Sequence, residues 1–263
     1  MKSQPQSYLF NFHWMLKDNL SIYETKKLFE KLEYSKYKSV LLTFQDDMPD
    51  TWIKSSHCID PEGSMKYMVA LRPYALTPAY CVMLAKSFNQ ISNNKLILNM
   101  IAGTTEADQQ AFEEPKPMHE RLIDCERFIL NFKLIWGDKD GMPEVAFTGS
   151  SLDAIHSTKS QGDISLFHIN NYIKHREQFN LIKDKRKIAR AWIIIAETDE
   201  EAERIFSSLD DEVEINNCIY GSENTIYQKM CYYKDIGIDE FMITCLRSDT
   251  EMLHDFVRKY SNT

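Results

Sequence analysis

The sequence lacks the cysteine patterns of zinc sites and of disulfide-stabilised domains. Its six cysteines, among 263 residues, form no CxxC pair and no Cys/His cluster, which argues against structural zinc. They are scattered through mostly apolar surroundings. We therefore expect reduced, buried thiols and no metal site.

Long apolar runs and a surplus of basic residues are also missing. No apolar stretch reaches membrane-spanning length, and residues 1–6 lack the apolar run of a signal peptide, so we expect a cytoplasmic protein without a membrane partner. The formal net charge of -8 argues against a nucleic-acid partner, which needs a basic face. The basic run 183–187 is interpreted as a solvated loop before a strand.

Short β-rich runs alternate with longer helical patterns along the whole chain. Such alternation implies parallel strands joined by crossover helices. Eight strands in this length predict a single-domain (β/α)8 TIM barrel over residues 1–263. A doubly wound open sheet is the alternative, but no GxGxxG follows the first strand. The predicted strands are 8–14, 39–44, 67–71, 96–101, 144–148, 164–168, 189–196 and 240–245.

The carboxyl ends of barrel strands are where catalytic residues are expected. His168 ends the sixth predicted strand, which favours it over the other histidines as a catalytic group. Arg190 and Trp192 alternate on the seventh strand and so share one face. An arginine inside a barrel needs a carboxylate or an anionic ligand, and the candidate carboxylates are Asp46, Asp47 and Glu62. A solvent-exposed start of the strand is the alternative for Arg190.

A glycine and two serines lie between the fifth strand and a helical pattern. Gly149, Ser150 and Ser151 could bind a phosphate through backbone N–H groups and hydroxyls at a helix start. An ordinary helix N-cap is the alternative, and spacing alone favours it.

The stretch 66–103 carries a more specific signal. It contains VALRP at 69–73, Thr77-Pro78 at a helix start, and the strand 95–103 with Asn99 and Gly103. In this order and spacing it resembles the luciferase-like flavin-dependent monooxygenases, and among them the alkanesulfonate monooxygenase branch. Residues 149–151, 190–202 and 220–241 resemble further motifs of the same family.

This resemblance implies a cofactor, partners and roles for individual residues. The cofactor would be reduced FMN (FMNH2), delivered by a partner flavin reductase, with molecular oxygen as co-substrate. The substrate would be small, free or carrier-bound, and the protein a homodimer. Arg190 would be an active-site arginine, and Trp192 and His168 its catalytic neighbours. The residues expected to hold the flavin are Ala70, Leu71, Asn99, Gly103, Gly149, Ser150 and Ser151, with a non-proline cis peptide at Ala70–Leu71.

Several positions depart from the family pattern. Trp192 replaces a histidine, Met48 aligns with a cysteine and Leu122 with a tyrosine. A tryptophan can stack on a ligand but cannot transfer protons. The family's long lid insertion before the last strand is missing. Two alternatives to a monooxygenase therefore stay open: a flavin-binding barrel without oxygenase chemistry, and a deazaflavin-dependent oxidoreductase.

Overall fold

The structure is a computed structural model that describes residues 8–16, 20–44, 49–103, 110, 116–138 and 140–262. Its strands are β1 (Asn11–Leu16), β2 (Ser39–Leu42), β3 (Lys66–Leu71), β4 (Leu96–Met100), β5 (Glu144–Thr148), β6 (Ile164–His168), β7 (Arg186–Ile195), β8 (Cys218–Gly221) and β9 (Glu240–Cys245).

Helices follow most of these strands. They are α1 (Ile22–Tyr34), α2 (Thr51–Ser56), α3 (Pro78–Ser92), α5 (Met118–Trp136), α6 (Leu152–Gln161), α7 (Ile169–Lys174), α8 (Arg176–Phe179), α9 (Asp199–Phe206), α10 (Glu212–Asn216), α11 (Glu223–Asp235) and α12 (Thr250–Tyr260). Within the described ranges, no helix is both long and apolar enough to span a bilayer.

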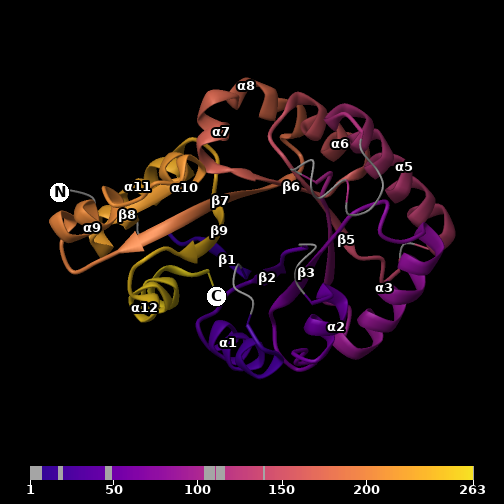
Figure 1. Ribbon diagram of the computed structural model, residues 1–263, viewed down its shortest axis with the longest axis horizontal. Coiled ribbons are helices and arrows are strands. Elements are labelled where there is room, and N and C mark those ends of the chain that lie inside the picture. The colour runs from indigo at the N-terminus through magenta and orange to yellow at the C-terminus, as the bar shows by residue number, and fades with distance from the viewer. Residues whose placement is uncertain are drawn as a thin grey trace, which may run out of the picture.

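The strands close into a parallel barrel, as the alternation predicted. The strands β1 to β7 pair in chain order, and β9 pairs with both β7 and β1, which completes the ring. Eight strands therefore form a (β/α)8 barrel surrounded by helices (Figure 1). The barrel strands coincide with the eight predicted segments, with their ends shifted by up to three residues.

A ninth strand, β8, was not predicted. It pairs with Trp192–Ile195, the second half of β7, whereas β6 pairs with the first half. The strand β7 thus runs past the end of β6 and out of the barrel toward α9, α10 and α11 (Figure 1). Residues 196–239 form this side structure in place of a simple crossover helix.

Two apolar cores result from the alternation of side chains along each strand. On β7, Ala189, Ala191 and Ile193 pack outward against the helices, while Ile188 and Trp192 point into the barrel. The barrel interior is filled by apolar side chains from most of the strands, including Met15, Leu41, Met68, Ile97, Leu166 and Met242. The described part of the barrel interior is therefore a packed core.

A ring of charges closes the amino-terminal end of the barrel. Arg186 pairs with Glu144 at 2.8 Å and with Glu240 at 2.7 Å, and Lys66 pairs with Glu144 at 2.6 Å. Burial acts to raise the pKa of Glu240, but the hydrogen bonds with His13 and Arg186 hold it at about 2. The interpretation of 183–187 as a solvated loop was thus wrong for Arg186. Its side chain lies on the same face of β7 as that of Ile188 and points into the barrel, because β7 begins at Arg186.

All six cysteines are free thiols. Cys58, Cys81 and Cys125 are buried, and the other three are partly buried. Burial raises the pKa of the Cys81 and Cys125 thiols to about 12, so both stay protonated and unreactive at neutral pH.

Candidate functional site

Three residues singled out in the sequence meet at the carboxyl end of the barrel. His168, the last residue of β6, lies beside Arg190 in the β6–β7 ladder. Trp192 follows on the same face of β7, and its ring stacks on His168 with centroids 5.4 Å apart and planes 15° apart. The predicted catalytic set is thus brought together by one pair of neighbouring strands.

No carboxylate among the described residues forms an ion pair with Arg190. Its Nη2 lies 3.0 Å from the Sδ of Met15, and its Nε is buried with no hydrogen-bond partner. Desolvation lowers the pKa of Arg190 to about 10. A cation in this setting is costly, and an anion beside it would offset the cost.

The carboxylates proposed for Arg190 do not reach it where they can be located. Glu62 is exposed in the loop before β3, at the opposite end of the barrel. Asp46 and Asp47 lie outside the described residues, as does Met48. The alternative that Arg190 lies at a solvent-exposed start of its strand is also wrong, because β7 begins four residues earlier, at Arg186.

His168 is neutral in this environment. Burial, with a smaller contribution from the Arg190 charge, lowers the pKa of His168 to about 4. Its Nδ1 is buried and makes no hydrogen bond within the described part of the chain. At neutral pH the imidazole is therefore a hydrogen-bonding group and only a weak base.

Of the residues expected around a flavin ring, Asn99 and Ala70 lie on the barrel side of their strands and Leu71 does not. Asn99 and Ala70 are buried on adjacent strands and register partners. The Oδ1 of Asn99 accepts a 2.8 Å hydrogen bond from Thr148 Oγ1, which leaves the Asn99 Nδ2 as the donor of that amide. Ala70 belongs to the barrel interior, whereas Leu71 packs outside it against the helices. The side chain of Leu71 thus faces away from the site.

The predicted cis peptide at Ala70–Leu71 is wrong. Every peptide bond among the described residues is trans. The β3–β4 ladder runs unbroken through Leu71, which pairs with Met100 and accepts a hydrogen bond from the Ile101 N–H through its carbonyl. A regular trans strand satisfies these backbone groups.

Gly149, Ser150 and Ser151 form a tight turn into α6. Gly149 has a φ of +149°, and a Cβ at this position would lie 2.8 Å from the Cβ of Ala154. Ser151 caps the helix, because its Oγ accepts from the Ala154 N–H at 3.2 Å. Ser150 Oγ accepts from Asn171 Nδ2 at 2.5 Å. The N-cap interpretation is therefore confirmed for Ser151, and each hydroxyl keeps its hydrogen available to an anion.

A pair of buried arginines beside Gly103 was not among the predicted site residues. Gly103 has a φ of +79°, and a Cβ there would lie 3.2 Å from both Arg121 Nη1 and Tyr74 Oη. Arg121 Nη1 donates to the carbonyls of Ala102, at 2.6 Å, and Gly103. Arg72 donates to Tyr74 Oη at 3.1 Å. The sequence carries only a partial signal for Arg121, which directly precedes Leu122, the residue that aligns with a tyrosine of the family pattern.

Comparisons with known proteins agree on the fold. No family model matches the chain. The structure is similar to the EDTA monooxygenase EmoA from Chelativorans sp. BNC1, with a TM-score of 0.77, 10% identity, and coverage of 95% of this chain and 92% of that one. It is similar to the riboflavin lyase RcaE, solved with modified FMN and riboflavin, with a TM-score of 0.78, 13% identity, and coverage of 97% and 93%.

A third similar structure uses a different cofactor. It is the coenzyme F420 dependent tetrahydromethanopterin reductase from Methanopyrus kandleri, with a TM-score of 0.75, 10% identity, and coverage of 96% of this chain and 98% of that one. These matches span nearly the full length of each chain. They show that the chain shares the (β/α)8 barrel fold of these enzymes, as the strand–helix alternation predicted.

Proposed function

We propose that the protein is a flavin-dependent monooxygenase of the luciferase-like type, a cytoplasmic enzyme that uses reduced FMN and O2 to oxidise a small substrate. The observation that carries the proposal is Arg190, a desolvated cation with no carboxylate beside it in the described chain, at the functional end of the barrel. Structural relatives described as a monooxygenase and as a lyase with modified FMN support it.

The residues present fit a flavin phosphate. Gly149 leaves room that a Cβ would fill, and the turn of Ser150 and Ser151 offers two hydroxyls at the start of α6. The amino end of this ten-residue helix adds backbone N–H groups and a favourable dipole. Arg121 adds positive charge at the end of β4, the strand next to β5. Asn99 Nδ2 would be the donor to the flavin ring, since its Oδ1 already accepts from Thr148.

The side chains around Arg190 would favour negative charge and exclude water. Arg190 attracts an anionic ligand, and its desolvated setting strengthens that attraction. Trp192 and the apolar side chains of Met15 and Leu41 shield the site. His168 stays neutral, so it would hold a ligand proton by hydrogen bonding without adding a second positive charge. When bound, reduced FMN would supply the electrons that activate O2, and a flavin reductase would supply it in reduced form.

A titration of the protein with reduced FMN under anaerobic conditions, followed by O2, tests this proposal. We expect saturable binding, followed by oxidation of the flavin at a rate that differs from that of free FMN. Ser150→Ala should weaken binding about five- to tenfold, because it removes one hydrogen bond to a charged group. The exposed α6 variant Lys159→Gln is the control. If neither oxidised nor reduced FMN binds, the proposal fails.

A deazaflavin-dependent oxidoreductase is the second candidate function. It is favoured by the F420-dependent structural relatives and by the absence of a long lid between β7 and β9, since hydride transfer does not require O2 activation in a dry site. The same anaerobic titration with a reduced deazaflavin distinguishes the two. Tighter binding of the deazaflavin than of FMN would favour this candidate, and binding of either without turnover would favour a non-catalytic flavin-binding barrel.

A further inference from the structure

The turn that enters α6 is fastened to the neighbouring β6–α7 unit. The N–H of Gly149 donates to the carbonyl of Leu166, on β6, at 2.9 Å. Ser150 Oγ accepts a hydrogen bond from the Nδ2 of Asn171 at 2.5 Å. Asn171 lies in the first turn of α7, which follows β6 directly. Two consecutive residues of the turn are therefore held by the next unit of the barrel.

The direction of the bond from Asn171 decides what Ser150 can offer to a ligand. A serine hydroxyl has one hydrogen to donate and two lone pairs that accept, whereas an amide NH2 group can only donate. Asn171 Nδ2 therefore takes up a lone pair of Ser150 and leaves the hydroxyl hydrogen for another acceptor. The oxygens of a phosphate dianion only accept hydrogen bonds, so a hydroxyl held in this way is complementary to them.

Helix α7, which carries Asn171, is capped from the side structure. His168 is the N-cap residue of α7, but its side chain makes no capping hydrogen bond. Asn217, directly before β8, supplies the cap, because its Oδ1 accepts from the N–H of Asn170 at 3.1 Å. The carbonyl of Asn217 accepts from the N–H of Trp192, also at 3.1 Å. The start of α7 is thus tied to both β7 and β8.

The amide of Asn217 is itself fixed. This residue is only 6% exposed, and its Nδ2 donates to the carbonyl of Val213 at 2.8 Å, which directs Oδ1 toward α7. A six-residue helix has little stability of its own, so such a cap contributes to its placement. The position of Asn171 beside Ser150 is therefore set by the surrounding structure.

We propose that Asn171 is a positioning residue that fixes Ser150 as a hydrogen-bond donor to the phosphate of the ligand. This inference rests on the proposed flavin function. Asn171 acts through Ser150 and favours FMN over riboflavin, which ends in a hydroxyl where FMN has its phosphate. A ligand hydroxyl is uncharged, so it gains less than a phosphate from the donor at Ser150.

Anaerobic calorimetric titrations of the full chain with reduced FMN and with reduced riboflavin test the inference. We expect the wild type to bind FMN about tenfold or more tightly than riboflavin, because hydrogen bonds to a charged phosphate are stronger than those to a hydroxyl. Asn171→Leu should weaken FMN binding about twofold, since Ser150 keeps its hydrogen but loses the bond that orients it.

Asn171→Asp gives the sharper result. A carboxylate only accepts, so Ser150 would donate its hydrogen to the new side chain, and the added negative charge would repel the phosphate. FMN affinity should fall about tenfold or more, whereas riboflavin affinity should change by less than about twofold. Thermal melting of the ligand-free variants shows whether each one is folded.

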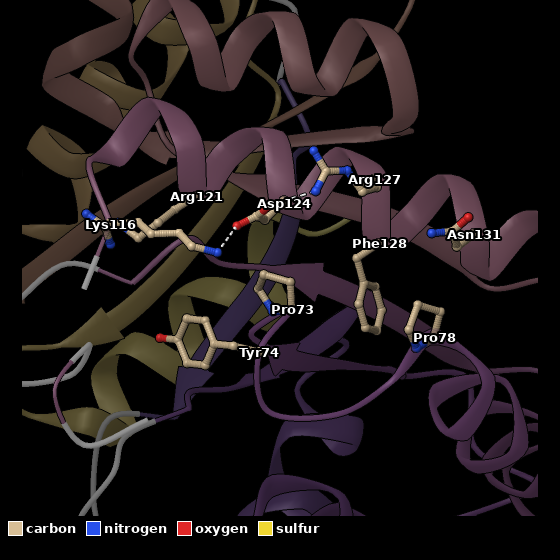
Figure 2. A pocket seen from close by; sticks show the side chains of 9 residues that line it. All are labelled: Pro73, Tyr74, Pro78, Lys116, Arg121, Asp124, Arg127, Phe128 and Asn131. Atoms are coloured by element: carbon tan, nitrogen blue, oxygen red, sulfur yellow. Dashed lines mark hydrogen bonds and ion pairs between the residues drawn. The ribbon is translucent and has the colours of Figure 1, made fainter. Parts of the chain in front are cut away.

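Two controls separate this role from a purely structural one. Asn131→Asp makes the same change of charge at an exposed position on the second half of α5 (Figure 2), which leads away from the carboxyl end of the barrel. It should leave both affinities unchanged. In a Ser150→Ala background, Asn171→Leu should have no further effect on FMN binding, because the hydroxyl through which Asn171 acts is gone.

The two flavins also distinguish failure of this inference from failure of the flavin function. If the wild type binds FMN and riboflavin equally well, the flavin function stands and the role of Asn171 is refuted. It is also refuted if Asn171→Asp weakens binding of both flavins equally, or if Asn171→Leu weakens FMN binding further in the Ser150→Ala background. If neither flavin binds, the flavin function fails and this inference fails with it.

Discussion

His168 and Trp192 stack face to face across neighbouring strands, with ring centroids 5.4 Å apart. The contact joins a neutral imidazole to a buried indole, Trp192, which the sequence resemblance aligns with a histidine. Two histidines facing each other beside Arg190 would both resist protonation. Trp192 therefore places an apolar ring beside His168 where the resemblance has a second titratable group. The effect of this ring on stability can be measured.

Trp192→His should destabilise the protein. Trp192 is 5% exposed and packs within the barrel interior, so the smaller ring leaves a cavity beside His168. We expect a loss of about 3 kcal/mol in the free energy of unfolding, measured by urea denaturation at pH 7. Trp192→Phe, which keeps an apolar ring, should lose less. Unchanged stability in Trp192→His would mean that the indole lines an open pocket.

Arg190→Met should change stability and ligand binding in opposite directions. Replacing a desolvated cation by an apolar side chain of similar length should raise the free energy of unfolding by about 1–3 kcal/mol. Loss of the positive charge should weaken binding of an anionic ligand by about 2–5 kcal/mol. FMN titration and thermal melting of the same variant provide both measurements. A variant that alters neither quantity would remove Arg190 from the site.

His254 should make stability depend on pH. This histidine, on α12, is fully buried against Trp14 and Tyr37, and burial lowers its pKa to about 4. As the pH falls below about 6.5, the unfolded chain binds a proton that the folded protein does not. The free energy of unfolding should therefore fall by about 2 kcal/mol between pH 7 and pH 5 from this group.

The substitution His254→Phe isolates that contribution. The variant should lose about 2 kcal/mol less than the wild type over the same interval, because the phenyl ring cannot bind a proton. His168, whose pKa is lowered in the same direction, remains in both proteins and cancels in the comparison. Equal pH dependence in the two proteins would show that His254 titrates normally in the folded state.

A substitution on α5 tests the proposed homodimer. The helices α3 and α5 lie side by side and expose several large apolar side chains, including Met83, Ile91, Leu130 and Leu134. Leu134 is 70% exposed, so Leu134→Asp should leave the fold intact. If this face joins two copies, the variant should sediment as a monomer at concentrations where the wild type is a dimer. If the wild type and the variant are both monomers, or both dimers, this face is not a dimer interface.

The sequence by itself determined the eight barrel strands and the fold class, but not the side strand β8. Alternating apolar residues and short breaks predicted the barrel strands, because side-chain periodicity is a local property. Thr77 before Pro78 and Ser151 before Leu152 cap the helices that they were expected to begin, because a cap needs only residues three positions apart. The resemblance around residues 66–103 likewise predicted a (β/α)8 barrel.

The tertiary structure decided which charges meet. Arg186 pairs with Glu144 and Glu240, which are 42 and 54 residues away. No local sequence pattern could therefore predict that Arg186 belongs to the barrel and not to the basic run 183–187. Arg121 reaches the carbonyl of Gly103, and Arg190 meets a methionine 175 residues away where a carboxylate was expected. Local sequence sets the direction in which a side chain points from its strand or helix, but burial and partners depend on the closure of the barrel, which brings distant strands together.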